Sequence, residues 1–485
     1  MEHKNSKQPL LEEEEEEEDQ VLGLLSIPRY SLQRLSNLSF FSSFVADDED
    51  IAPIESFNRF MSAFKDESSK LWYLAGPAIF TSLCQYSLGA FTQTFAGHVG
   101  TLELAAFSIE NSVIAGLSLG VMLGMGSAVE TLCGQAFGAG QHDMLGVYLQ
   151  RSWIILLATG LLLMFLYIFA LPFLLVIGQT ESISRVAGKL ALWMIPQLFA
   201  YALNFPTAKF LQAQSKIMAM ALISAAALVL HIVLSWLLML KLGWGMAGGA
   251  AVLDASWWFI VILQLIYIFS GTCGKAWPGF TMRSFTNLWG FVRLSLASAV
   301  MMCLETWYFM ALVLFAGYLK DAEVAVSALS VCVRVSNELG ASRPKTAKFS
   351  VVVMVVSAFF IGLLVSILLL VFQDQYPSLF SDSDAVKEVV YELTPLLAFS
   401  IVVNSIQPAL SGVAIGAGWQ AMIANVNIVC YYVFGVPLGL ILGYTLNMGV
   451  KASIAAKRIK HWRGETNVAK TRDVEKVTNQ TESNN

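Results

Sequence analysis

Long apolar runs alternate with short polar turns along most of the chain, and this pattern predicts helices that cross a membrane. About 20 consecutive apolar residues are needed to span a bilayer as an α-helix. The runs that reach this length are 72–96, 105–129, 151–177, 187–211, 217–240, 246–270, 290–316, 349–373, 390–412 and 421–444. The sequence therefore predicts an all-α membrane protein with about ten full transmembrane spans.

Composition supports the same class. Hydrophobic residues make up 56% of the chain and charged residues 13%, against about 25% charged in an average soluble domain. The acidic run Glu12–Asp19 carries much of the negative charge behind the net charge of −5, and it lies in a tail unable to form a core. The first 20 residues are polar and contain no cleavable signal peptide, so we expect the N-terminus to stay in the cytosol.

Polar segments divide the chain into parts. We predict a disordered acidic tail over residues 1–70 and an N-lobe of six helices over 71–271. A cytosolic loop at 272–289 leads to a C-lobe of about four full helices over 290–450, and a polar C-terminal tail covers 451–485. Lys275 and Arg283 place the central loop in the cytosol under the positive-inside rule. The six cysteines lie far apart without paired metal or redox spacing, so we interpret them as small buried hydrophobes.

The two predicted lobes contain an internal repeat. Phe95-Ala96-Gly97 followed by Glu103-Leu104-Ala105 matches Phe315-Ala316-Gly317 followed by Glu323-Val324-Ala325. Further along, Gly138-Ala139 matches Gly340-Ala341, and Pro206 matches Pro408. Two related lobes that rock around a solute site are typical of secondary transporters.

The second copy of the repeat is shorter than the first. It lacks about 18 residues between Ser327 and Asn337, where the first copy has its whole second span. Only an apolar stub at 324–333 remains, which is too short to cross a bilayer of about 30 Å. The basic segment 451–463 stands where the first half has its last span. Helices 8 and 12 of a twelve-helix plan are therefore predicted to be missing.

Several motifs resemble those of a known family. They are Ala128–Gly140, Tyr148–Ser152, Phe210–Ser215, Arg334–Ala341 and Gln407–Ala414. In sequence and order they resemble the plant multidrug and toxic compound extrusion (MATE) transporters, also called the DETOXIFICATION family, over about residues 70–450. The subgroup that looks most similar is that of the vacuolar flavonoid transporters.

The resemblance implies two pseudo-symmetric helical bundles of the MATE 6+6 plan, here with the second bundle incomplete. It also implies a proton-coupled antiporter that exports organic solutes such as xenobiotics or flavonoid-like metabolites from the cytosol. Such a protein is no enzyme and uses a proton gradient in place of a cofactor or ATP. We expect a monomer in the vacuolar or plasma membrane that binds no nucleic acid.

The shortened second half leaves another interpretation open. The chain resembles a truncated, transport-inactive isoform or the product of a faulty gene model. If the stub does not span, the basic loop 334–348 would lie on the outer side, against the positive-inside pattern. Either the second lobe is then inverted and misfolded, or the seventh helix and the stub rearrange to restore parity, and we expect a damaged second lobe.

Glu305 is the strongest candidate for proton coupling. It lies in the middle of the predicted span 290–316, where a charged carboxylate costs several kcal/mol unless it is partnered or protonated. The family resemblance carries a coupling glutamate at this place in Leu304–Trp307. The alternative is a structural hydrogen bond between helices.

Other residues are candidates for contacts in a polar solute cavity. They are Gln85, Tyr86, Asn204, Trp307, Tyr308 and Asn404. Gln85 is the repeat mate of Glu305, and Asn404 stands where some family members have an aspartate. The aromatic rings could stack on a flat organic solute, with plain packing as the alternative.

Two weaker candidates and two segments complete the set. His231 and Asp254 also lie inside predicted spans and could respond to pH. The run Gly134–Gly140 is not a phosphate-binding loop, because no Lys-Ser or Lys-Thr follows it, and we interpret it as a turn that ends a helix. We interpret Arg334, Arg343, Lys345 and Lys348 as loop charges that face the cytosol and anionic lipid.

Overall fold

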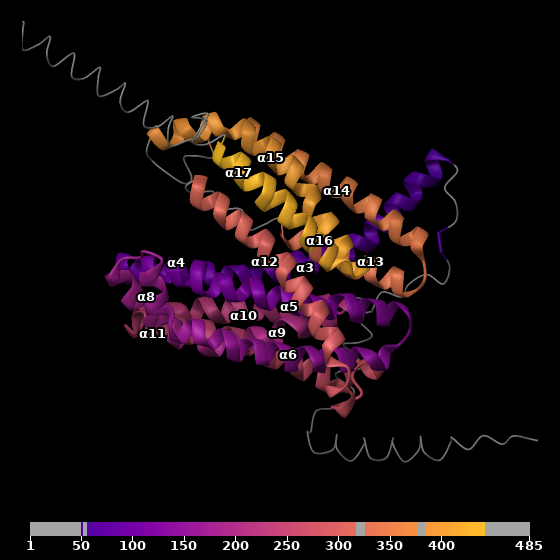
Figure 1. Cartoon of the computed structure of the whole chain (residues 1–485), viewed down its shortest axis with the longest axis horizontal. Coiled ribbons are helices and arrows are strands. Elements are labelled where there is room, and N and C mark those ends of the chain that lie inside the picture. The colour runs from indigo at the N-terminus through magenta and orange to yellow at the C-terminus, as the bar shows by residue number, and fades with distance from the viewer. Residues whose placement is uncertain (1–49, 52–55, 317–324, 376–383, 442–485) are drawn as a thin grey trace, which may run out of the picture. The chain divides into compact units, whose positions relative to one another are not determined.

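The structure is a computed structural model that describes residues 50–51, 56–316, 325–375 and 384–441. Within these ranges, the side chains of 306–316, 325–332, 384–390, 392–393 and 439–440 are not described. The described residues form helices and turns without any β-strand, which confirms the predicted all-α class (Figure 1).

The N-lobe is a bundle of helices joined by short turns. Its elements are α3 (Phe57–Val99), α4 (Thr101–Ile109), η1 (Glu110–Ala115), α5 (Gly116–Gly138), α6 (His142–Ile168), α7 (Ala170–Val176), α8 (Glu181–Trp193), α9 (Ile195–Ala213), α10 (Ile217–Ser235), η2 (Trp236–Lys241), α11 (Gly245–Tyr267) and η3 (Ile268–Thr272). Figure 1 shows α4, α8 and α11 at one end of this bundle, and α4 and α11 both contact α8. If the N-terminus and the central loop are cytosolic, as the sequence predicts, the parity of the spans makes this the outer end.

A short linker and the C-lobe follow. The linker holds η4 (Gly274–Ala276) and η5 (Met282–Phe285). The C-lobe elements are α12 (Leu288–Ala316), α13 (Ala325–Gly340), α14 (Pro344–Val371), α15 (Asp384–Ala417), α16 (Gln420–Asn427), η7 (Ile428–Gly435) and α17 (Val436–Leu440). Figure 1 shows α14, α15 and α16 side by side, and α15 contacts both of its neighbours.

The predicted spans fall on these helices. Eight helices of the described chain are long and apolar enough to cross a membrane, or nine if the bent pair α8 and α9 is one span. The first predicted span, 72–96, lies within α3, which is not among those helices. Helix α3 begins at Phe57, inside the range predicted as a disordered tail, so that boundary was wrong.

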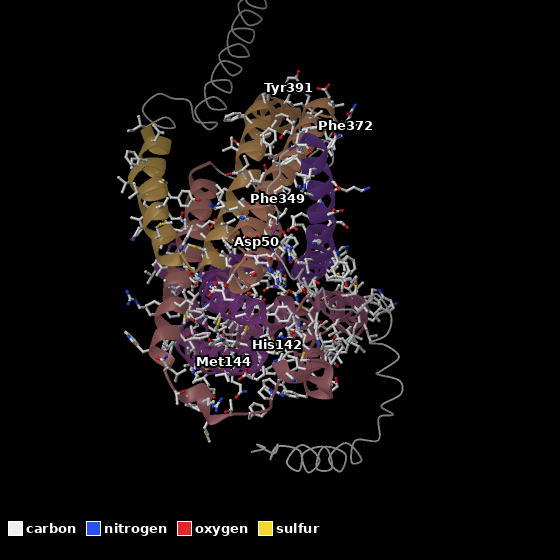
Figure 2. The ribbon with its side chains drawn as sticks, turned by 90° about the vertical axis from the view of Figure 1, so that its right-hand side faces the viewer. Asp50, His142, Met144, Phe349, Phe372 and Tyr391 are labelled. Atoms are coloured by element: carbon white, nitrogen blue, oxygen red, sulfur yellow. The ribbon has the colours of Figure 1, made fainter. Side chains whose placement is uncertain are left out.

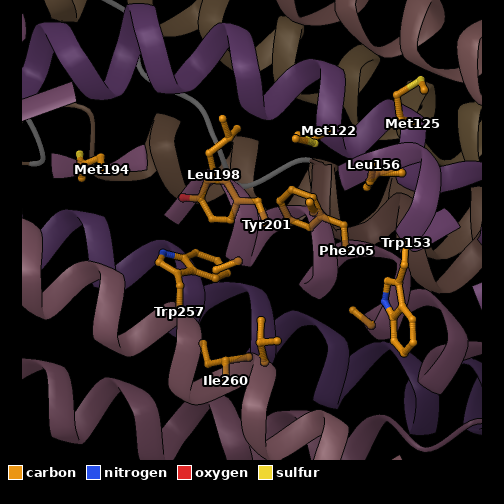
Figure 3. Packing of buried hydrophobic residues seen from close by; sticks show 14 of the residues in the cluster. Met122, Met125, Trp153, Leu156, Met194, Leu198, Tyr201, Phe205, Trp257 and Ile260 are labelled. Carbon is orange, nitrogen blue, oxygen red and sulfur yellow. The ribbon is translucent and has the colours of Figure 1, made fainter. Parts of the chain in front are cut away.

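The largest buried cluster lies in the N-lobe (Figure 3). In it, Trp257 of α11 packs edge-on against Tyr201 of α9 with 4.7 Å between ring centroids, and Tyr201 stacks on Phe205. The cluster combines such large rings with many alanines, as expected where close van der Waals packing between helices holds the bundle together in lipid. Cys84, Cys133, Cys273 and Cys303 are buried, as the sequence predicted, whereas Cys430 is exposed, so the prediction was wrong for that residue.

The start of α14 is held by the segment before α3. The Asp50 carboxylate accepts hydrogen bonds from the Thr346 amide at 2.9 Å and from the Thr346 hydroxyl at 2.7 Å. Phe349 lies one turn after Thr346 on α14 and packs edge-on against Phe60 of α3. Figure 2 labels both Asp50 and Phe349. These amides are among the unpaired donors of a helix N-terminus, so Asp50 caps α14 from a distance in sequence.

Helix α13 covers most of the predicted stub at 324–333 and extends to Gly340. The charged side chains near its end differ from the prediction. Arg334 is buried at 2% exposure and pairs with Glu67 of α3 at 2.9 Å and with Glu338 at 2.5 Å. The prediction that Arg334 is a loop charge facing cytosol and lipid was therefore wrong, because Glu67 supplies an acidic partner far away in sequence. Lys345 and Lys348 are exposed, as predicted, whereas Arg343 is half-buried and pairs with Glu338 at 3.6 Å.

The end of α13 lies at the cytosolic end of α5. A Cβ atom added at Gly138 would overlap the backbone of Asn337, and one added at Gly340 would overlap the backbone of Gln135. On the predicted topology, the basic segment around Arg343 thus lies at the cytosolic end of the N-lobe, where the positive-inside rule expects it. Residues 317–324, which join α12 to α13, lie outside the described residues, so the loss of helix 8 and its consequence for the second lobe stay predictions.

Candidate functional site

Glu305 lies on α12, half-buried, with a neutral partner from a distant helix. Its Oε1 accepts a hydrogen bond of 2.9 Å from Nε2 of Gln407 on α15. The same amide lies 3.1 Å from the Ser411 hydroxyl and 3.4 Å from the Tyr431 hydroxyl of η7. Three elements therefore converge on the carboxyl predicted from the sequence.

Hydroxyl and amide groups also tie the neighbouring backbone to the C-lobe. The Tyr432 hydroxyl donates to the Leu304 carbonyl at 3.0 Å, and Asn427 donates to the Met301 carbonyl at 3.5 Å. These bonds hold the turn of α12 that carries Glu305 against α16 and η7. The site is thus a carboxyl on a fixed backbone, with the neutral amide of Gln407 as its donor among the described residues.

Asn404 lies one turn before Gln407 on α15, with an exposed side chain. No contact joins it to Glu305 among the described residues. Trp307 and Tyr308 follow Glu305 on α12, but their side chains lie outside the described residues. The structure therefore joins Glu305 to Gln407, a residue that the sequence placed in a motif without giving it a role.

The candidates of the first half are spread over two helices. Gln85 on α3 is half-buried and donates to the Ser224 hydroxyl of α10 at 3.4 Å, and Tyr86 is 62% exposed. Asn204 on α9 is 1% exposed, and its Oδ1 has no hydrogen-bond partner among the described residues. None of them has a described contact with Glu305, so the structure does not bring the predicted set together in one site.

His231 has a structural environment. It is fully buried on α10, where Nε2 lies 3.0 Å from the Thr92 hydroxyl of α3 and Nδ1 lies 2.9 Å from the Ser256 hydroxyl of α11. Each ring nitrogen thus has a neutral hydroxyl partner. Such a histidine joins three helices, so a role in pH response gains no support here.

The last turns of α5, which include the glycine run, contact the C-lobe. The Thr131 hydroxyl donates to the Ile415 carbonyl at 2.6 Å, and Gln135 donates to the Gly416 carbonyl at 3.2 Å. Gly134 leaves room for the Ser336 side chain. Gly140 has φ of +71°, which fits the predicted helix-ending turn. The run therefore serves close packing between helices.

Two groups were missed by sequence reasoning. Gln407 could not be assigned because its contact with Glu305 depends on how α15 is turned toward α12. Glu110 is a carboxyl inside the predicted span 105–129, which was the available signal, and the structure shows it fully buried at the start of η1.

Comparison with known proteins gives concordant matches. The family model described as MatE matches residues 77–237 and 327–441. The chain is 59% identical to Protein DETOXIFICATION 29 of Arabidopsis thaliana over 470 residues, which cover 87% of this chain and 94% of that protein. It is 64% identical to Protein DETOXIFICATION 30 of the same plant over 421 residues, which cover 83% of this chain and 84% of that protein.

Solved structures agree in fold. The crystal structure of the eukaryotic MATE transporter AtDTX14 matches with a TM-score of 0.73 and 34% identity, covering 81% of this chain and 92% of that one. The bent form of the Vibrio cholerae MATE transporter VcmN matches with a TM-score of 0.69 and covers 83% of this chain and 96% of that one. At 16% identity, this match shows a shared fold alone. The chain belongs to the MATE family and is a multi-pass membrane transporter of the multidrug and toxin efflux type.

Proposed function

We propose that the protein exports organic solutes from the cytosol in exchange for protons, with Glu305 as the carboxyl that binds and releases the proton. The observation that carries this proposal is the pairing of a half-buried carboxyl within a membrane helix with the neutral amide of Gln407. A charged carboxylate at such a depth needs compensation. Proton uptake supplies it without any basic partner.

The solute would be a flat organic molecule. Tyr86 offers an exposed ring on α3, and aromatic rings stack on planar or cationic molecules. Such contacts need no fixed pattern of hydrogen bonds, which suits a transporter with several substrates. We expect the protein to lie in the vacuolar membrane or the plasma membrane. Imaging of the tagged full-length chain in plant cells distinguishes the two locations.

Flux measurements in proteoliposomes test the coupling. A pH gradient imposed across the vesicle membrane should drive uptake of a fluorescent organic cation or a polyphenol, and a protonophore should abolish that uptake. Glu305→Gln should reduce gradient-driven flux at least tenfold, whereas Glu181→Gln, an exposed carboxyl on α8, should leave it unchanged. Flux that ignores both the gradient and Glu305→Gln would overturn the proposal.

One observation favours a second candidate, a transport-inactive form. Helix α13 has 16 residues, which span about 24 Å against a hydrocarbon core of about 30 Å. The flux of this chain can be compared with that of a variant carrying about 18 additional apolar residues, the length by which the repeat is short, before Val333. Flux only from the lengthened variant would support the inactive form.

A further inference from the structure

A second pair of carboxyl groups lies in the N-lobe, apart from Glu305. Glu110 at the start of η1 is 0% exposed, and neither of its carboxyl oxygens has a hydrogen-bond partner among the described residues. Asp254 on α11 is half-buried, and its Oδ1 also lacks a partner. The charge of Asp254 acts on Glu110, and α8 packs against both η1 and α11, the elements that carry the two carboxyl groups.

The backbone at Glu110 departs from a regular α-helix, as it also does at η2, η3 and η7. Residues Glu110–Ala115 form a π-helix between α4 and α5. Single turns of π-helix inside an α-helix are rare and frequently mark functional sites. The irregular turn thus coincides with the buried unpartnered carboxyl.

The groups around the pair are neutral. Tyr167 of α6 and Tyr201 of α9 are both buried and interact electrostatically with both carboxyl groups. Gln197 donates a side-chain hydrogen bond to the Tyr201 hydroxyl, which lies in the cluster of Figure 3, and its backbone bonds to Asp254. That backbone donor belongs to the first turn of α9, where amides have no partner within the helix.

Helix α8, which packs against η1 and α11, brings no positive charge to the pair. Its buried face presents Ser184, whose hydroxyl has no described partner. Its charged side chains Glu181 and Arg185 form an exposed ion pair with each other, and Lys189 is exposed. Among the described residues, no lysine or arginine is paired with either carboxyl group.

These surroundings leave protonation as the means of balancing the pair. An isolated ionised carboxylate in a low-dielectric interior is strongly disfavoured, and it neutralises by taking up a proton. Two carboxylates that share a site cannot readily both be ionised, so such a pair holds a proton between them. Sodium is the other small cation that could balance the charge.

The pair lies in the outer half of the N-lobe. Glu110 and Asp254 each follow the outer start of their helices, Thr101 and Gly245, by about nine residues, which is about 14 Å along the axis. A proton arriving from the outer side would therefore reach this pair from the end where α4, α8 and α11 meet.

We propose that Glu110 and Asp254 form a second proton-binding site, which takes up one proton from the outer side and releases it during the transport cycle. The proposal rests on the proposed proton-coupled function. It gives the transporter one titratable site in each lobe.

Infrared difference spectroscopy tests the site without requiring transport. The full chain, purified in detergent, is compared between acidic and alkaline pH as wild type, Glu110→Gln, Asp254→Asn and the matched control Glu181→Gln. We expect a protonated-carboxyl band that titrates in the wild type and the control, and that is lost or shifted in the Glu110 and Asp254 variants. Identical difference spectra for all four proteins would overturn the proposal.

Two further measurements sharpen the result. Sodium chloride added at constant pH should leave the band unchanged, and a loss of the band would identify a sodium site and overturn the proposal. In proteoliposomes, Glu110→Gln should lower the number of protons moved per solute by about one. If Glu305→Gln leaves flux intact while the Glu110 band still titrates, the function proposed for Glu305 fails and the N-lobe site stands.

Discussion

Lys209 Nζ on α9 donates a hydrogen bond of 2.6 Å to Glu130 Oε2 on α5, and both side chains are buried. Removing one member of such a pair leaves the other charge without compensation in the interior. We expect Glu130→Ala to lower the free energy of unfolding by about 3–5 kcal/mol. Thermal unfolding of the purified chain in detergent measures the change.

The double variant Glu130→Gln/Lys209→Met is the control for this pair. It removes both charges and keeps similar volumes, so it should recover most of the lost stability. A double variant as unstable as Glu130→Ala would show that packing, and not the charge pair, sets the cost.

Gly138→Ala should weaken the contact between α5 and α13. The added methyl group overlaps the backbone of Asn337, and forcing extra volume into a packed interface costs about 1–3 kcal/mol. We expect a lower unfolding temperature and reduced solute flux. Gly89→Ala on α3 is the matched control, because nothing lies within 4 Å of its Cβ position; a Gly138→Ala protein as stable as this control would contradict the contact.

Arg334→Lys tests the buried ion network. The Arg334 guanidinium reaches both carboxylate oxygens of Glu67, at 2.9 and 3.2 Å, and also pairs with Glu338. A lysine has a single ammonium group and cannot reproduce this planar fork. We expect a loss of about 1.5–3 kcal/mol, the range for hydrogen bonds to charged groups, measured by unfolding, with the exposed Arg185→Lys as control.

Gln407→Leu tests the partner of Glu305. It removes the donor at 2.9 Å from Glu305 Oε1 while keeping a similar volume. A hydrogen bond to a charged group contributes about 1.5–3 kcal/mol, so we expect gradient-driven flux to fall about 10- to 100-fold. Asn404 lies one turn away, so Asn404→Leu should reduce the flux less. Equal losses of flux in the two variants would mean that Gln407 has no special role.

The cap on α14 predicts a dependence on acid. Desolvation acts to raise the pKa of Asp50, but hydrogen bonds from Thr346, Lys345 and Ile51 outweigh it and hold the pKa below its ordinary value of 3.8. The stabilisation is therefore present above pH 3.8 and lost as the pH falls through the lower, folded-state pKa. Hydrogen exchange at the Thr346 amide should accelerate there, and Asp50→Ala should accelerate it at neutral pH.

Much of the fold followed from the apolar pattern, because every lipid-facing helix must be apolar over a bilayer's thickness. Glu305 could be found for the same reason, since a carboxyl within a long apolar run is conspicuous. Its partner Gln407 is 102 residues away, and no local pattern reports which face of α15 meets α12.

The charges at the cytosolic side were harder to interpret. Arg334 looked like one of several loop cations, but its partner Glu67 lies 267 residues earlier, in a segment too polar to suggest a helix. Because Arg334 and Glu67 pair with each other, both side chains are buried and serve a structural role. Local composition therefore misjudged the beginning of α3 and the burial of α13 together.

The linker between the lobes is fastened to the N-lobe along most of its length. Gln150 of α6 donates to the Gly279 carbonyl and accepts from the Thr281 amide, while Arg151 donates to the Arg283 carbonyl. Asn287, with φ of +52°, is the residue directly before α12. A swing of α12 against the N-lobe would thus bend the backbone at this left-handed residue, which follows the fastened part of the linker. Stiffening the backbone there would slow such a swing without touching any proton-binding group.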